Sequence, residues 1–187
     1  MAGDVANAAG GLDPSFGGDG KVLTNLTPGF DHAGGVAIQA DGKIVAAGIA
    51  DAQFGLVRYR ATGTRDSTFG GGDGWVATDF GDGPDWATDV AIQADGKIVA
   101  AGTAGFQRFA VARYEADGTL DSTFGGDGRV ITDFTGGSRE EAAQGVVVQP
   151  DGRIVVAGWS WSQTPGLPWP ATRRMVTSTR PSEATAR

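Results

Sequence analysis

The sequence contains no cysteine and only one histidine, His32, among its 187 residues. Without cysteine the chain forms no disulfides, offers no thiolate to a metal ion and has no cysteine nucleophile. No apolar run approaches the roughly 20 residues of a membrane-spanning helix. The formal net charge of −7 argues against binding to a phosphate backbone, which requires a surface rich in lysine and arginine. We therefore expect neither a membrane span nor a nucleic-acid partner.

Residues 1–11 are small and polar and are interpreted as a lead-in. They have neither the basic nor the apolar segment of a secretory signal peptide, so we expect no signal peptide in this chain. The chain does have 32 glycines, scattered among aspartate and threonine. This composition is typical of an all-β protein with many turns.

Nearly the same stretch occurs three times. It reads GVAIQADGKIVAAG at residues 35–48, DVAIQADGKIVAAG at 89–102 and GVVVQPDGRIVVAG at 145–158. An apolar run, then Asp-Gly, then a second apolar run is a strong hairpin signal, because glycine supplies the positive φ of a tight turn. Each copy therefore predicts a β-hairpin, and the three turns contain Asp41, Asp95 and Asp151.

A second motif, LDPSFGGDGKV, has near copies in RDSTFGGGDGWV and LDSTFGGDGRV, with Phe16, Phe69 and Phe124 at intervals of 53 and 55 residues. This period is long enough for four short strands. In each module we expect a first strand, then the two hairpin strands, then a fourth strand. The first strands are expected at residues 21–26, 75–80 and 129–134, and the fourth strands at 54–60 and 109–115.

Four antiparallel strands repeated with glycine-rich turns are typical of a β-propeller blade. A β-sandwich is the alternative, but it does not require near-identical repeats. We predict an all-β fold, a β-propeller-like array of four-stranded antiparallel blades, two complete and the third lacking its last strand. The repeat modules are assigned to residues 12–64, 65–119 and, incompletely, 120–162.

Residues 163–187 depart from the repeat, and their composition shifts to proline, arginine, threonine and serine. In another reading frame, with suitable codons, residues 168–186 yield LARYEADGDLDPSFGGDG, which continues the repeat. We hypothesise that a frameshift has replaced the rest of the module, and we expect this tail to be disordered. The apolar strand at residues 153–158 would then be an exposed edge.

Two blades and part of a third are too few to close a ring, because propellers have about 4–8 blades. The chain is therefore either a truncated fragment of a longer array or a protein whose open ends self-associate. The frameshift hypothesis favours the fragment.

The first candidate site consists of carboxylates in the GGDG turns, namely Asp19, Asp73 and Asp127. Repeated carboxylates near carbonyl groups could hold Ca²⁺, which takes about six to eight oxygen ligands. The spacing matches neither an EF-hand loop nor the glycine nonapeptide of Ca²⁺-binding β-rolls. We favour a turn-forming role, in which aspartate accepts backbone hydrogen bonds and glycine provides the conformation. No cofactor is expected, and Ca²⁺ is the alternative.

Two further residue types recur at matching positions, the arginines Arg58 and Arg113 and the aspartates Asp13, Asp66 and Asp121. Because no base or nucleophile recurs with them, we expect a structural ion pair, with Arg58 and Asp66 in bidentate contact. The three phenylalanines of the second motif are expected to be core anchors between consecutive blades.

His32 aligns with Trp86 and Ala142, so no catalytic histidine recurs in the modules. A Ser-His-Asp triad would depend on His32 alone, and we expect a surface histidine instead. The tryptophans Trp75, Trp86, Trp159 and Trp161 could stack against a sugar, although a packing role is favoured. We predict no catalytic residues and no metal ligands other than the weak Ca²⁺ candidates.

The order DxxFGGDGxV, then VAIQxDGKIVAAG, then FxxxRY resembles the Delta-60 repeat family over residues 12–161. The resemblance implies a β-propeller-like fold in a large bacterial protein that is secreted or surface-associated, with no catalytic residues to transfer. An extracellular or cell-surface location is expected on this ground alone.

We therefore expect a non-enzymatic repeat or scaffold module of a bacterial exported or surface protein, which contacts a protein or a glycan. The alternatives are a Ca²⁺-stabilised adhesion array and a fragment of a propeller-type hydrolase or lyase. The hydrolase or lyase would need acid, base or metal ligands converging on a central channel.

Overall fold

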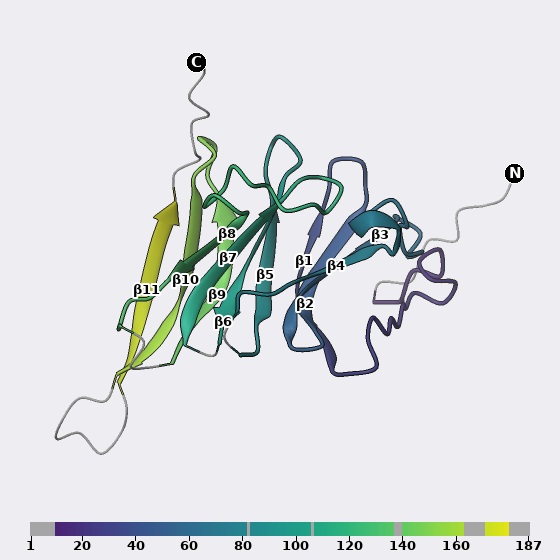
Figure 1. Cartoon of the computed structure of the whole chain (residues 1–187). Helices are drawn as coiled ribbons and strands as arrows, with labels where there is room; N and C mark the ends of the chain where they lie inside the picture. The colour runs from purple at the N-terminus through teal and green to yellow at the C-terminus, as the bar shows by residue number, and fades with distance from the viewer. Residues whose placement is uncertain (1–9, 82, 106, 137–139, 163–170, 180–187) are drawn as a thin grey trace, which may run out of the picture.

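The computed structural model of the chain describes residues 10–81, 83–105, 107–136, 140–162 and 171–179. Within these ranges the strands form three antiparallel sheets that stand side by side (Figure 1). We call the sheets blades 1, 2 and 3. The predicted all-β, propeller-like array of antiparallel blades is confirmed. In the described ranges, no helix is long and apolar enough to cross a membrane.

Blades 1 and 2 each contain four strands in sequential order. Blade 1 consists of β1 (Asp31–Ile38), β2 (Ile44–Ala50), β3 (Gln53–Tyr59) and β4 (Trp75–Thr78), with a short 3₁₀ turn, η1 (Gly70–Gly72), before β4. Blade 2 consists of β5 (Trp86–Ile92), β6 (Ile98–Ala104), β7 (Arg108–Tyr114) and β8 (Arg129–Thr132).

Blade 3 contains β9 (Glu141–Val148), β10 (Ile154–Ser162) and β11 (Ala171–Thr179), with β10 in the middle. The predicted disorder of residues 163–187 is therefore wrong for β11, and the exposed edge predicted at 153–158 is covered. β11 pairs with the whole of β10, from Ile154 opposite Thr179 to Ser162 opposite Ala171. Strand pairing uses backbone groups, so a segment that departs from the repeat but contains β-branched residues can still fill an open edge. Residues 163–170 and 180–187 of the predicted tail lie outside the described ranges.

Blades 1 and 2 each take their outer strand from the following repeat. β4 and β8 come from the segments predicted as first strands, but they pair with β3 and β7 of the preceding repeat. The blades are thus offset by one strand from the modules assigned to residues 12–64, 65–119 and 120–162. The third such segment, residues 21–26, is not a strand, and the prediction of one there is wrong. No described strand precedes it in the position that β3 occupies beside β4.

The three predicted hairpins are confirmed. β1 and β2, β5 and β6, and β9 and β10 pair across the Asp-Gly turns. The first strand of each pair carries one irregularity in its register, and a glycine lies opposite it. A Cβ added at Gly48 would lie 1.8 Å from the carbonyl oxygen of His32, and one at Gly102 would lie 2.0 Å from that of Trp86. Glycine is therefore required at these positions by the close approach of backbone.

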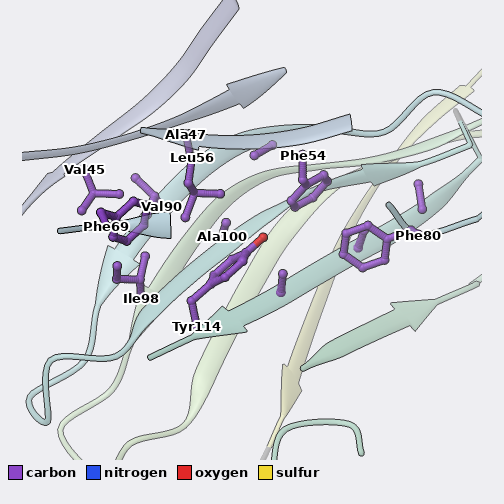
Figure 2. Close-up of a cluster of buried hydrophobic side chains, with 14 residues drawn as sticks. Val45, Ala47, Phe54, Leu56, Phe69, Phe80, Val90, Ile98, Ala100 and Tyr114 are labelled. Carbon is purple, nitrogen blue, oxygen red and sulfur yellow. The ribbon is translucent and has the colours of Figure 1, made fainter. Parts of the chain in front are cut away.

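Apolar side chains fill the space between neighbouring blades. Figure 2 shows Val45, Leu56 and Phe69 gathered with Val90 and Ile98 of blade 2. A second cluster joins blades 2 and 3 and includes Val99, Val111, Phe124, Val146 and Val156. The core is therefore not inside a sheet but between sheets, as in face-to-face sheet packing.

Two tyrosine hydroxyls add polar contacts, one across the junction of blades 1 and 2 and one from blade 1 to the segment that precedes it. Tyr114 of β7 is fully buried and donates to the Thr78 hydroxyl of β4 at 2.8 Å. Burial raises the pKa of Tyr114, so the phenol remains a donor. Tyr59 of β3 makes the matching contact with Thr24 at 2.7 Å. The segment that contains Thr24 thus lies against blade 1 as β4 lies against blade 2.

The contact between Phe69 and Gly118 gives a test of the blade junction. A Cβ at Gly118 would lie 2.8 Å from the Phe69 ring, whereas one at Gly126 would meet nothing within 4 Å. Their φ angles are nearly equal, +94° and +95°, so alanine carries the same backbone cost of about 1–2 kcal/mol at both. We predict that Gly118→Ala lowers the free energy of unfolding in urea by about 1–3 kcal/mol more than Gly126→Ala does. Equal losses would show that the junction is loosely packed.

Candidate functional site

A buried arginine connects blade 1 to blade 2. Arg58 Nε donates to Asp66 Oδ2 at 2.9 Å, and both side chains are nearly inaccessible, at 5% and 1%. Nη2 donates to the Thr68 hydroxyl at 3.0 Å, and Nη1 donates to the carbonyl of Ala116 in blade 2. The guanidinium also lies 4.7 Å from the centroid of the Phe69 ring. The predicted pairing is confirmed, but it is not bidentate, because the two Nη groups have other partners.

Arg113 repeats most of this arrangement at the next junction. Its Nε donates to Asp121 Oδ2 at 2.8 Å, Nη2 donates to Thr123 at 3.1 Å, and the guanidinium lies 4.7 Å from the Phe124 ring centroid. Lys97 Nζ lies 3.3 Å from the same aspartate. Among the described residues of blade 3, no carbonyl takes the place that Ala116 has for Arg58.

The neighbours of Asp121 stabilise the ionised form of its carboxylate. Burial alone would raise its pKa, but the Thr123 hydroxyl and amide, Lys97 and Arg113 favour the ionised form. Their combined effect lowers the pKa of Asp121 from 3.8 to about 2. The pair is therefore an element of blade structure, since an acid held so firmly in its charged form is a poor general base near neutral pH.

The first copy of this arrangement is incomplete. Asp13 accepts hydrogen bonds from the Ser15 amide at 2.9 Å and hydroxyl at 2.7 Å. Arg58 and Arg113 precede their aspartates by eight residues, but the residue eight before Asp13 is Val5. Phe69 and Phe124 are buried, which confirms them as core anchors, whereas Phe16 is only half-buried. The prediction that all three phenylalanines are core anchors is therefore wrong for Phe16.

The weak Ca²⁺ candidates lie in separate exposed turns. Asp19 accepts from the Lys21 amide at 3.1 Å. Asp127 accepts from the Arg129 amide at 3.0 Å and from Arg129 Nη2 at 2.7 Å, and these bonds lower the pKa of Asp127. Asp73 directly follows η1. The described part of the chain contains no group of three or more His, Cys, Asp or Glu residues placed to hold a metal ion.

The hairpin aspartates have the same turn geometry in all three blades. Asp41, Asp95 and Asp151 each accept the amide of the residue two positions later, at 3.1, 3.2 and 3.1 Å. The glycine that follows each aspartate has a φ between +81° and +89°. This is the geometry that the turn-forming interpretation requires.

A repeated acidic residue was missed in the sequence. Asp31, Asp85 and Glu141 begin or immediately precede the first strand of each blade, four residues before Gly35, Asp89 and Gly145. The three carboxylates accept the amides of Leu26, Phe80 and Phe134, respectively, at 2.8, 2.7 and 3.1 Å. Burial raises the pKa of Asp85, more than its bonds from Phe80 and Gly105 lower it. The constant spacing before the hairpin could have identified this position.

An apolar recess of about 430 Å³ lies between the first strands of blades 1 and 2. Phe30, His32 and Ile49 line it from one side, and Trp86 and Thr88 line it from the other. The Phe30 and His32 rings are stacked, with centroids 6.2 Å apart and planes 9° from parallel. His32 is exposed, as its sequence position suggested. The structure thus brings two residues from aligned positions, His32 and Trp86, to one surface.

The other tryptophans do not join the recess. Trp75 begins β4, on the outer edge of blade 1. Trp159 and Trp161 lie in β10, with ring centroids 6.4 Å apart. The four tryptophans that could have stacked against a sugar are therefore distributed over three places.

Comparison with known families supports the architecture. Residues 39–69, 93–124 and 149–167 match a family described as a domain of unknown function (DUF5122), beta-propeller. The first two matches begin at a hairpin turn and extend to the buried phenylalanines Phe69 and Phe124. The chain is thus a β-propeller-like protein, similar to this family in each of its three repeats. No curated protein matches the sequence.

The shifted pKa of Asp121 predicts acid sensitivity. Its folded pKa, about 2, is below the unfolded value of 3.8, so its stabilisation is present above pH 4 and is lost as the pH falls toward 2. This one group accounts for about 2 kcal/mol. We predict that Asp121→Asn is less stable than wild type at pH 7 and that the difference shrinks between pH 4 and pH 2. Denaturant unfolding across this range measures it, and parallel curves would contradict the assignment.

Proposed function

We propose that the chain is a non-enzymatic scaffold module, related to the Delta-60 repeat proteins, of a bacterial exported or surface protein. We further propose that the recess between blades 1 and 2 makes its ligand contacts, with a glycan as the preferred ligand and a protein side chain as the alternative. An extracellular or cell-surface location belongs to this proposal and rests on the resemblance between the repeats.

One observation carries the proposal. The polar residues that recur in the repeats are engaged in holding the protein together, as the Arg58–Asp66 and Arg113–Asp121 pairs illustrate. The residues that line the recess differ between repeats, since His32 and Trp86 correspond to Ala142 in blade 3. Residues that vary on a constant framework are suited to recognition, because the framework does not need them.

The chemistry of the recess favours a ligand with a flat apolar face. Phe30 is 70% exposed and lies parallel to His32, with Trp86 on the opposite side. Binding sites of several hundred Å³ are mostly apolar with a few polar groups that orient the ligand. The carbon-bound hydrogens of a sugar ring pack well on such rings, while its hydroxyls remain available to the His32 imidazole.

Nuclear magnetic resonance titration tests the recess. We predict that at least one of maltotriose, cellotriose, mannotriose and N,N′,N″-triacetylchitotriose shifts the Trp86 indole resonance at concentrations up to about 10 mM. Trp86→Ala should weaken that binding by at least about tenfold, equivalent to the roughly 1.4 kcal/mol of one lost ring contact. Trp75→Ala is the control and should bind as wild type. If no sugar produces a shift, the glycan proposal is wrong.

The enzymatic alternative has less support. A hydrolase or lyase needs a base within hydrogen-bond distance of the group it deprotonates. His32 stacks on Phe30, and the buried aspartates Asp66 and Asp121 are paired with arginine. We therefore favour binding over catalysis.

A calcium-stabilised adhesion array is separated from this proposal by thermal unfolding. A site filled at 100 times its Kd would stabilise the chain by about 2.7 kcal/mol. That energy raises Tm by roughly 5–11 °C for a chain of this size. We predict that neither EDTA nor added Ca²⁺ changes Tm by more than about 1 °C. A larger rise that Asp127→Asn removes would support the calcium array instead.

A further inference from the structure

We propose that two copies of this chain associate head to tail. In this arrangement blade 1 of each copy packs on blade 3 of the other, and residues 21–26 supply the fourth strand of the partner's blade 3. This inference is independent of the ligand proposed for the recess, because it uses the two outer faces of the array.

The chain contains its own template for this interface. On blade 2, the row of paired residues Val90, Ala100 and Ala112 is buried against blade 1. On blade 3, Val146 and Val156 are buried against blade 2 in the same way. The same type of face is thus covered by the preceding blade at both junctions.

Blade 1 has this face without a covering blade, although Val57 in the row is 7% exposed beside residues 21–26. The matching row consists of Val36, Ala46 and Val57, which are paired across β1, β2 and β3. Val36 is 65% exposed, although its counterparts Val90 and Val146 are each 5% exposed. Ile38, on the same face, is 69% exposed. We call this surface the leading face, and the missing contact is that of a preceding blade.

Blade 3 has the complementary face, also without a cover. Val147 pairs with Val155, and Ala157 pairs with Val176. Val155 and Ala157 correspond to Val45 and Ala47 of blade 1, and Val176 corresponds to Leu56; these three residues of blade 1 are buried against blade 2. In blade 3, Ala157 is exposed and Val155 is half-buried, while Val176 is 66% and Val147 59% exposed. We call this surface the trailing face. Within the chain, the leading faces of blades 2 and 3 pack on a surface of this kind.

The number of strands in the blades also supports a second copy of the chain as the partner, because blade 3 has three described strands and blades 1 and 2 have four. Blade 3 has no described strand beyond β11, whose outer edge is therefore open. Residues 21–26 correspond to the outer strands β4 and β8 but belong to no sheet, and Leu23 is fully exposed. They already lie against blade 1 through the Thr24–Tyr59 hydrogen bond. Addition of this segment to the partner would supply hydrogen-bond partners to the outer edge of β11.

Two copies would cover the two outer faces of the three described blades. A head-to-tail interface gives a closed ring only if the rotation closes. Two copies of the three described blades make a ring of six, within the usual range of about 4–8 blades, whereas three copies would exceed it. The closed two-copy ring leaves no leading or trailing face exposed.

Light scattering after size-exclusion chromatography tests the association. We predict a mass twice that of one chain for the full chain at micromolar concentrations. Val36→Lys on the leading face and Val147→Lys on the trailing face should each give a folded monomer, because both sites are exposed within one chain. Leu12→Lys is the control and should remain a dimer. Leu12 is as exposed as Val147, and its counterparts Arg65 and Leu120 stay outside the packed junctions.

A mixture of the two variants distinguishes head-to-tail from symmetric pairing. The mixture retains one intact pair of leading and trailing faces, so a dimer should reappear that neither variant forms alone. With Val36→Cys in one chain and Ala157→Cys in the other, oxidation should link the chains, which have no other cysteine. A wild-type monomer at all concentrations, a mass that grows with concentration, or no recovery on mixing would overturn the proposal.

Discussion

Each sheet in this protein is apolar on both faces, and this requirement for a neighbour on each side governs the rest of the structure. Ile98 and Val99 are adjacent in β6, yet both are fully buried, because one faces blade 1 and the other faces blade 3. A single four-stranded sheet with two such faces would not be stable in water. The stability of each blade therefore depends on the neighbouring blades that bury its apolar faces. The two outermost faces have no neighbouring blade in the described part of the chain.

The connections between blades strengthen this packing. Because β4 and β8 come from the following repeat, each blade is covalently tied to the next through its outer strand and the loop that carries Phe69 or Phe124. Arg58 adds a hydrogen bond to the Ala116 carbonyl across the junction, and Tyr114 adds one to Thr78. A buried ion pair of this kind contributes specificity of register more readily than net stability.

Much of the fold could be predicted from the sequence because its signals are local and repeated three times. The Asp-Gly hairpins, the antiparallel blades and the pairing of Arg58 with Asp66 all follow from short spacings. The offset between repeat and blade could not be predicted, because four strands of one period can be grouped into a sheet in more than one way. The recess was missed for a related reason, since Phe30 and Trp86 meet only when two blades pack.

The error in the tail shows how strongly an open sheet edge can influence a neighbouring segment. Composition alone indicated disorder, since residues 171–179 lack the apolar pattern of β3 and β7. β10, however, offers a full row of backbone donors and acceptors, and pairing with it requires only an extended chain. Val176 remains 66% exposed, so the strand is held by its backbone partner more than by a core. β11 therefore pairs with the edge of β10 but does not cover the apolar face of blade 3. Val147 and Val176 on that face stay exposed to solvent.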